Sequence, residues 1–432
     1  MGKFDSILRI ITQLPEAKAK LKRINFQQLT PTQIKLTANR IREGLTEVLL
    51  RGDEALLEQA ELFSFNLQIT VLEIEAAEQK VEEELLKAIR ETSRNLMYFY
   101  EQKIPKSWVN FAEEDVIVSK RYIPLRRIGI YIPAQTTRAL MVLMLNSICA
   151  QVAQVEQIVL ILDPEIKKHT ENVLLAAAKE LGISEIYRLP SIGAIGALAY
   201  GTSSISRVDL ILGPSDLEIK LAKGMVAGEV GVETHFSEHN LFIFADAKAE
   251  PLWLAKDILA QIQENSSAIL LTKSSKLAKL VQGEVEKQLE KLEYNQELEV
   301  TQKIILSSLI IVVDSLEIAV ELINEFAPQS LQLAVKDPWS ILHKIKNAGT
   351  VFMGYSTPPI VGTYFGGVAI NLLGGGVARF ASALSPENFL KQTNVIEYSS
   401  SALAKVLPTL EILSRDADNP NALESIKDRL NN

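Results

Sequence analysis

Residues 127–162 read RIGIYIPAQTTRALMVLMLNSICAQVAQVEQIVLIL, and this stretch decides the fold. Two short apolar runs, at 128–132 and 158–162, have the length and the β-branched content of buried strands. The apolar segment between them, at 138–154, is long enough for a helix. A strand, a helix and a second strand at this spacing predict two parallel strands joined by a covering helix.

The same alternation continues along the chain and then begins again. After the first unit we predict helices at 171–181 and 194–200 and strands at 186–189 and 208–212. A second series has strands at 241–244, 268–272, 308–313 and 350–353 and helices at 251–261, 275–292 and 316–325. We therefore predict an α/β fold with two Rossmann-like parallel-sheet domains.

The segments outside these two series are predicted to be mainly helical. Residues 78–100 carry apolar side chains at helical spacing, and the last segment of the chain has a similar pattern. We predict an N-terminal helical segment at 1–25 and a C-terminal helical segment at 381–432. The first Rossmann-like domain is assigned to 26–127 together with 240–380, and the second to 128–239.

The composition is that of a globular protein with more than one core. The chain has 432 residues, of which 47% are hydrophobic and 23% charged. A net charge of −8 without a long basic run argues against nucleic acid or an anionic membrane as a partner. The single cysteine, Cys149, excludes an intrachain disulfide framework. We find no secretory signal in residues 1–12 and no run of about 18 apolar residues, so we expect a cytoplasmic protein.

Several segments, in order, resemble the histidinol dehydrogenase family. They are IPKSWV at 104–109, GIYIP at 129–133, ALAYGT at 197–202, GYSTP at 354–358, ARFAS at 378–382 and VIEYS at 395–399. The resemblance covers nearly the whole chain and implies a histidinol dehydrogenase-like fold. It also implies a zinc-containing homodimer that oxidises L-histidinol to L-histidine with two molecules of NAD, the last step of histidine biosynthesis.

The segment at 324–333, NEFAPQSLQL, is similar to the family sequence NEFAPEHLEL. The resemblance places the catalytic glutamate and histidine at Gln329 and Ser330. Neither an amide nor an unactivated hydroxyl titrates near neutral pH, so neither can act as a general acid or base. A serine nucleophile would need a nearby base, for which His235 and His239 are the candidates by analogy.

The family binds zinc through a glutamine, a histidine, an aspartate and a second histidine from the C-terminal segment. The resemblance places the glutamine at Gln261, or at Gln263 if the local gap is placed differently, and the adjoining helix has no histidine. The aspartate falls on Thr363 and the C-terminal histidine near Ala422. Three of the four positions carry residues that do not bind zinc, so we expect zinc to be absent.

The resemblance also assigns cofactor and substrate positions. Tyr131 stands where a family tyrosine contacts the nucleotide, and Gly193 and Asp216 replace a glutamine and an asparagine on the cofactor side. The carboxylate of Asp216 would face the pyrophosphate of NAD unfavourably. The substrate-contacting serine falls on His239, and Gln261 is the second substrate position. NAD therefore stays a possible cofactor.

The spacing of His235 and His239 has two interpretations. The two imidazoles could form a new metal site if Glu233 or Glu238 supplied a third ligand. We favour ordinary loop or interface histidines, because the segment directly precedes a predicted strand.

Three functions remain in competition. We favour a non-catalytic homologue that acts in binding or regulation. The alternatives are an NAD-dependent dehydrogenase that uses another alcohol without zinc, and a histidinol dehydrogenase with unconventional ligands. In each case the resemblance implies a homodimer in which the C-terminal segment reaches across to the other subunit.

Overall fold

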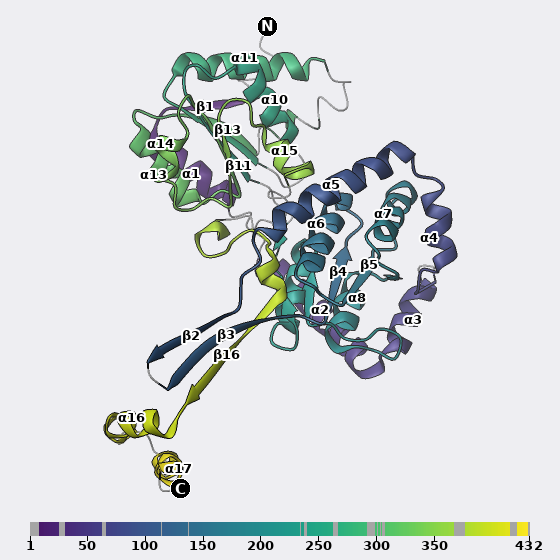
Figure 1. Ribbon diagram of the computed structural model, residues 1–432. Coiled ribbons are helices and arrows are strands. Elements are labelled where there is room, and N and C mark those ends of the chain that lie inside the picture. The colour runs from purple at the N-terminus through teal and green to yellow at the C-terminus, as the bar shows by residue number, and fades with distance from the viewer. Residues whose placement is uncertain are drawn as a thin grey trace.

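The computed structural model describes residues 8–25, 31–62, 66–113, 115–136, 138–233, 235–236, 240–261, 267–291, 299, 301–302, 304, 307–366, 376–414 and 421–430. The protein contains two parallel sheets covered by helices, and an antiparallel arm that carries the C-terminus (Figure 1). The α/β class and the two Rossmann-like sheets predicted from the sequence are confirmed.

The five-stranded sheet, called sheet B, is parallel throughout and has the order β6-β5-β4-β7-β9. Its strands are β4 (Arg127–Ile132), β5 (Gln157–Leu162), β6 (Glu185–Arg188), β7 (Leu210–Leu212) and β9 (Gly231–Val232). The intervening helices are α6 (Ala139–Val152), α7 (Lys168–Glu180), α8 (Ser191–Tyr200) and α9 (Leu217–Val226). Except for the two-residue β9, the sequence pattern predicts each of these strands.

The six-stranded sheet, called sheet A, is also parallel and has the order β1-β13-β12-β11-β14-β15. Its strands are β1 (Arg9–Ile11), β11 (Asn240–Ala245), β12 (Ser267–Thr272), β13 (Ser308–Val312), β14 (Ser330–Ala334) and β15 (Thr350–Met353). Its helices are α1 (Leu14–Asn25), α10 (Pro251–Gln261), α11 (Ser275–Leu289), α13 (Leu316–Phe326), α14 (Trp339–Leu342) and α15 (Pro359–Tyr364). Strands β1 and β14 were not predicted.

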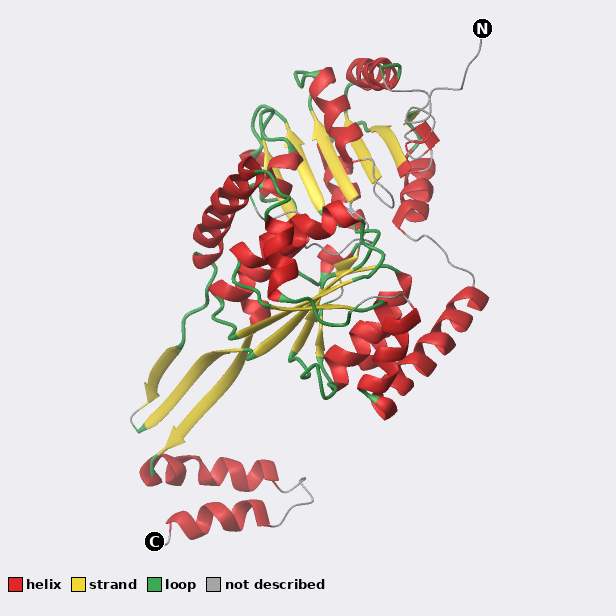
Figure 2. Ribbon diagram, turned by 90° about the vertical axis from the view of Figure 1, so that its right-hand side faces the viewer, coloured by secondary structure: helices red, strands yellow, loops and turns green. Residues whose placement is uncertain are grey.

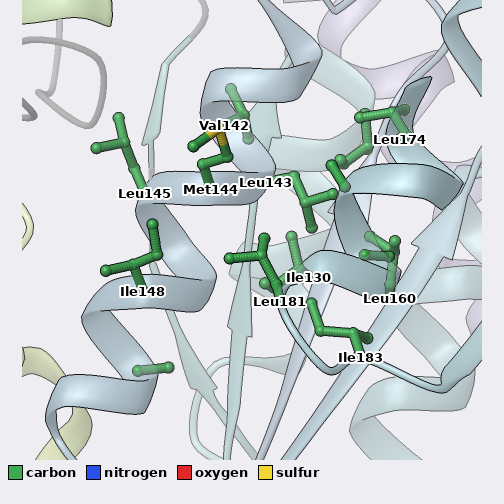
Figure 3. Close-up of a cluster of buried hydrophobic side chains, with 14 of the residues drawn as sticks. Ile130, Val142, Leu143, Met144, Leu145, Ile148, Leu160, Leu174, Leu181 and Ile183 are labelled. Carbon is green, nitrogen blue, oxygen red and sulfur yellow. The ribbon is translucent and has the colours of Figure 1, made fainter. Parts of the chain in front are cut away.

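Each sheet is packed between two layers of apolar side chains. Figure 3 shows part of one of these layers, a cluster that includes Leu143, Met144 and Ile148 of α6 together with Ile130 and Leu160 of sheet B. Fully burying a side chain of this size contributes roughly 1.5–3 kcal/mol, so the layers fix the strands and the loops at their ends.

The four helices that follow α1 pack on sheet B, which corrects the predicted domain assignment. Helices α2 (Pro31–Arg51), α3 (Asp53–Leu62), α4 (Val71–Glu78) and α5 (Glu83–Glu101) occupy the region that the sequence grouped with 240–380. Instead α2 packs on α8 and α9, α4 on α7, and α5 on α6. Helical periodicity shows that a helix has an apolar face but does not show which sheet covers it.

The C-terminal segment is not all helical, which is a second correction. Strand β16 (Leu390–Tyr398) follows the short helices η1 (Val377–Arg379) and η2 (Pro386–Phe389) and pairs antiparallel with β3 (Val116–Pro124). Strand β2 (Trp108–Glu113) completes the arm, which ends in α16 (Ser400–Leu413) and α17 (Asn421–Leu430). Both views show the arm standing away from the two sheets (Figures 1 and 2).

No helix within the described part of the chain has the length and apolar character needed to cross a membrane.

Candidate functional site

Most of the predicted site residues that the structure describes lie where the carboxyl edge of sheet B faces the amino edge of sheet A, and Ala422 lies apart from them. Strand β8 (Pro214–Ser215) follows directly from β7 and pairs with β10 (His235–Phe236), and β11 of sheet A begins shortly after β10. Figure 2 shows the two sheets one above the other. We call this region the junction.

Gln329 and Ser330 lie at the amino end of β14, on the sheet A side of the junction. Their exposed fractions are 1% and 8%, so both are buried. The backbone N–H of Asn240 donates a hydrogen bond to Oε1 of Gln329 at 3.3 Å. The amide of Gln329 therefore satisfies a backbone donor at the start of the neighbouring strand β11.

A buried polar contact lies behind this pair. Gln332, which follows Ser330 on the same face of β14, donates from Nε2 to Oδ2 of Asp257 in α10 at 2.9 Å. Burial raises the pKa of Asp257 to about 6. Asp257 lies one helical turn before Gln261, which is buried at the end of α10. Asp257 was not predicted from the sequence, because the pattern of apolar residues in α10 does not distinguish its carboxylate from one exposed to solvent.

The donors at the zinc positions do not fit the metal. Gln261 offers a neutral amide and Thr363 a neutral hydroxyl, which already accepts a hydrogen bond from Nη1 of Arg138 at 3.5 Å. Ala422 lies in α17, at the far end of the arm (Figure 1). Among the described residues, no group of three histidine, cysteine, aspartate or glutamate side chains could hold a metal ion. Zinc sites are built from thiolate, imidazole and carboxylate ligands.

Tyr131 is a core residue of sheet B. Its side chain is fully buried, and its hydroxyl donates to Oδ2 of Asp163 at 2.7 Å. Burial first, and then the charge of Asp163, raise the pKa of Tyr131 well above its ordinary range. Gly213 packs against the backbone here, because a Cβ at this position would lie 2.0 Å from the carbonyl oxygen of Tyr131. Its φ of +113° also favours glycine.

The two other cofactor positions have local structural roles. A Cβ on Gly193, in α8, would lie 2.2 Å from Oε1 of Gln59, so α3 occupies the space that a side chain at this position needs. Asp216 is the N-cap of α9, and its Oδ1 accepts a hydrogen bond from the backbone N–H of Ile219 at 2.9 Å. Capping of this kind stabilises a helix by about 1 kcal/mol. The roles of both residues toward a nucleotide stay predictions.

Lys223 is a second residue that the sequence analysis missed. It is fully buried, and its Nζ donates to the carbonyl of Gly213 at 2.7 Å, to Oγ of Ser215 at 3.1 Å and to the carbonyl of Glu233 at 3.0 Å. Burial lowers the pKa of Lys223 to about 7. The side chain ties the segment after β7 to the segment after β9 and so shapes the junction. The sequence signal that could have revealed Lys223 is a lysine among the apolar residues of α9.

The histidine pair stays a prediction. The backbone of His235 belongs to β10, whereas His239 lies outside the described residues, as does Gln263.

A pocket of about 570 Å³ lies elsewhere, between α1, α13 and η1. Leu21, Leu322 and Phe326 form apolar parts of its lining, and Lys22 and Arg379 add positive charge. None of the predicted site residues lines this pocket.

Comparisons with known proteins agree with the fold. The family model described as Histidinol dehydrogenase matches residues 28–430. A protein named Histidinol dehydrogenase 2 from Nostoc sp. is 40% identical to this chain, with 98% of this chain and 99% of that protein covered. Histidinol dehydrogenase from a Synechococcus sp. is 38% identical, with 98% of each covered. The crystal structure of histidinol dehydrogenase from Elizabethkingia anophelis superposes with a TM-score of 0.90 at 25% identity and covers 99% of both chains.

Proposed function

The chain belongs to the histidinol dehydrogenase family, and from that premise we propose that it is a member without zinc-dependent histidinol oxidation that acts in binding or regulation. In this proposal the chain has the family fold but lacks the residues that carry out the family's reaction. A shared fold does not carry an activity with it, because activity depends on the residues of the site.

The buried amide of Gln329 carries the proposal. A residue that removes protons must change its protonation state near the working pH, and an amide has no such state. The hydrogen bond from Asn240 gives Gln329 a structural role in joining β14 to β11. Ser330, in the following position, offers only a hydroxyl.

The zinc positions support the same conclusion. Gln261 and Thr363 lie on α10 and α15, which pack together, but neither carries a charge that would bind zinc. The hydroxyl of Thr363 is engaged by Arg138, a cation that opposes a second cation nearby. A site of this composition suits an anion better than a metal.

The test is a direct assay of the purified full-length chain. Bound zinc is measured by atomic absorption, and NADH formation is followed at 340 nm with L-histidinol and NAD. We expect no stoichiometric zinc and no oxidation above background. Stoichiometric zinc together with turnover would overturn the proposal.

A divergent NAD-dependent dehydrogenase is the second candidate. It is favoured by the strand order of sheet B, in which the third, second, first, fourth and fifth strands along the chain are neighbours. Binding of NAD, followed by calorimetry, together with NADH formation on a panel of alcohols, would favour this candidate. Among the described carboxyl groups, we take Asp257 as the candidate general base of this second function, because burial raises its pKa to about 6.

We also propose a cytoplasmic homodimer. The arm, with α16 and α17 at its end, is the part of the chain that would reach a second subunit. Both the location and the assembly are proposals that follow from the family and from the exposed apolar surface of the arm.

A further inference from the structure

Arg138 lies in the connection from β4 to α6, where the strand order of sheet B changes direction. In open α/β sheets, ligands bind at this switch point, outside the carboxyl ends of the strands. The residue has a φ of +58°, in the left-handed region that side chains other than glycine rarely adopt. Its surroundings therefore hold it in a conformation that costs free energy.

Two of the three nitrogens of the guanidinium are unpartnered. Nη1 makes a long hydrogen bond of 3.5 Å to Oγ1 of Thr363, whereas Nε and Nη2 are buried and bond to no other atom of the protein in the part of the chain that is described. Nε and Nη2 share one edge of the planar group, the edge that binds two oxygens of a carboxylate or phosphate side by side. The hydroxyl of Thr136, two residues earlier, is also buried without a partner.

No described carboxylate neutralises this arginine. Burial lowers the pKa of Arg138, and the group that partly offsets this effect, by its charge and by a hydrogen bond to the arginine side chain, is Tyr364, not an aspartate or glutamate. Arginine nevertheless keeps its proton in proteins, so the charge remains. Buried charges are normally paired, because an unpaired one loses its hydration without compensation. The missing partner is an anion.

We propose that Arg138 binds an oxyanion, a carboxylate or phosphate group of a small ligand, at the junction. Nε–H and Nη2–H donate to two oxygens of the ligand, and the hydroxyl of Thr136 is a third donor. Tyr364, which interacts with the guanidinium, is 47% exposed, so a residue at the edge of this position reaches the surface. The inference deepens the proposed function and rests on it, since a binding role needs a ligand class.

The experiment measures binding of two simple probes to the full-length chain. The protein is dialysed into a chloride buffer free of oxyanions and titrated with inorganic phosphate or with acetate at constant ionic strength, by calorimetry and by thermal shift. NAD is a third arm and shows whether the phosphate of a nucleotide occupies the site. The variants are Arg138→Met and Arg138→Lys. The control is Arg126→Met, because the side chain of Arg126 is 76% exposed and pairs with Glu156.

We expect phosphate or acetate to raise the melting temperature of the wild type and of the Arg126→Met control. Arg138→Met should weaken binding by about tenfold to a hundredfold, the effect of losing a charge-assisted pair of hydrogen bonds. Arg138→Lys should also weaken binding, because a lysine keeps the charge but lacks the planar edge. The phosphate and acetate arms decide which oxyanion is preferred.

The melting temperatures of the variants without a probe distinguish an arginine that binds a ligand from one that stabilises the fold. Without a probe, Arg138→Met should melt at or above the wild-type temperature, because it removes a buried charge that has no partner. A lower melting temperature of unliganded Arg138→Met, with equal probe effects on both proteins, would overturn the inference. So would the absence of any probe effect on the wild type. Neither result touches the proposed function, which only zinc-dependent histidinol turnover would overturn.

Discussion

At the scale of single residues, the positions assigned to the family's acid–base pair and to its aspartate ligand carry neutral polar side chains. Gln329, Ser330 and Thr363 are buried, and the first and last of them accept hydrogen bonds from neighbouring strands or loops. A buried polar group is tolerated when it is bonded, so these neutral side chains fit the fold.

Restoring the catalytic pair alone should not restore activity. The double substitution Gln329→Glu and Ser330→His supplies a base, but Gln261 and Thr363 still cannot hold zinc. We expect no histidinol oxidation above background, measured as NADH formation at 340 nm on protein whose circular dichroism matches the wild type. Measurable turnover would show that zinc is dispensable or is bound at another place.

Asp257 should make stability depend on pH. Its pKa rises from 3.8 to about 6 on folding, so between these values the folded protein keeps a proton that the unfolded chain has lost. This contribution to stability is fully present below pH 4 and is lost as the pH rises through 6, on the order of 3 kcal/mol in total. In Asp257→Asn the hydrogen bond from Gln332 is kept and the charge is removed.

The check for Asp257 is urea unfolding of wild type and Asp257→Asn at pH 4, 5, 6 and 7.5. The free energy of unfolding of the variant should exceed that of the wild type above pH 6, and the two should converge near pH 4. Glu250→Gln, an exposed change just before α10, is the control and should leave the free energy of unfolding within about 0.5 kcal/mol. Parallel curves for Asp257→Asn and wild type would contradict the prediction.

The site residues that lie in a family motif could be predicted from the sequence. The site residues whose role depends on burial could not. Gln329, Ser330 and Thr363 follow from the motifs. Arg138 and Lys223 owe their character to burial, and burial of a single charged side chain depends on elements distant in the chain.

At the scale of elements, the parallel strands were predictable because each is a short apolar run between helices. Strand β14 was missed because Ser330 and Gln332 interrupt the continuous apolar run by which the other buried strands were predicted. Strand β16 was missed because most of its side chains are exposed, so that burial imposes no apolar alternation on its sequence. The placement of α2 to α5 on sheet B depends on tertiary packing that no local pattern encodes.

Two glycines should respond in opposite ways to the same substitution. Gly283 lies within α11, and a Cβ added there meets nothing within 4 Å, so Gly283→Ala should raise the free energy of unfolding by about 0.5–1 kcal/mol. Gly213→Ala places a Cβ against the backbone of Tyr131 at a φ of +113° and should lower it by at least about 2 kcal/mol. Urea unfolding of both variants checks the pair, and a stabilised Gly213→Ala would contradict the geometry at β7.

At the scale of the whole molecule, the exposed apolar surface of the arm favours a second subunit as its partner. Six large apolar side chains of its strands are between 39% and 73% exposed, and they are Trp108, Val109, Phe111, Val395, Ile396 and Tyr398. Monomeric proteins rarely leave such a surface in water, and a second copy of the arm would cover it.

Light scattering on a sizing column should give about twice the chain mass of 47.9 kDa. Ile396→Asp should shift the protein toward the monomer, because it puts a charge into the apolar surface of the arm. Leu50→Asp is the matched control: Leu50 is 75% exposed on α2 and should leave the dimer intact. A concentration-independent wild-type monomer would refute the proposed assembly.

The pairing of β1 with β13 sets an order in which the chain can be completed during synthesis. Arg9 pairs with Leu309, whereas every strand of sheet B lies between residues 127 and 232. All strands of sheet B are therefore synthesised before β13, the strand with which β1 pairs. Pulse proteolysis of stalled nascent chains should find sheet B protected as soon as residue 240 has emerged, and residues 8–25 cleavable until β13 has been made. We therefore expect β1, although it is made before sheet B, to complete its pairing after sheet B has folded.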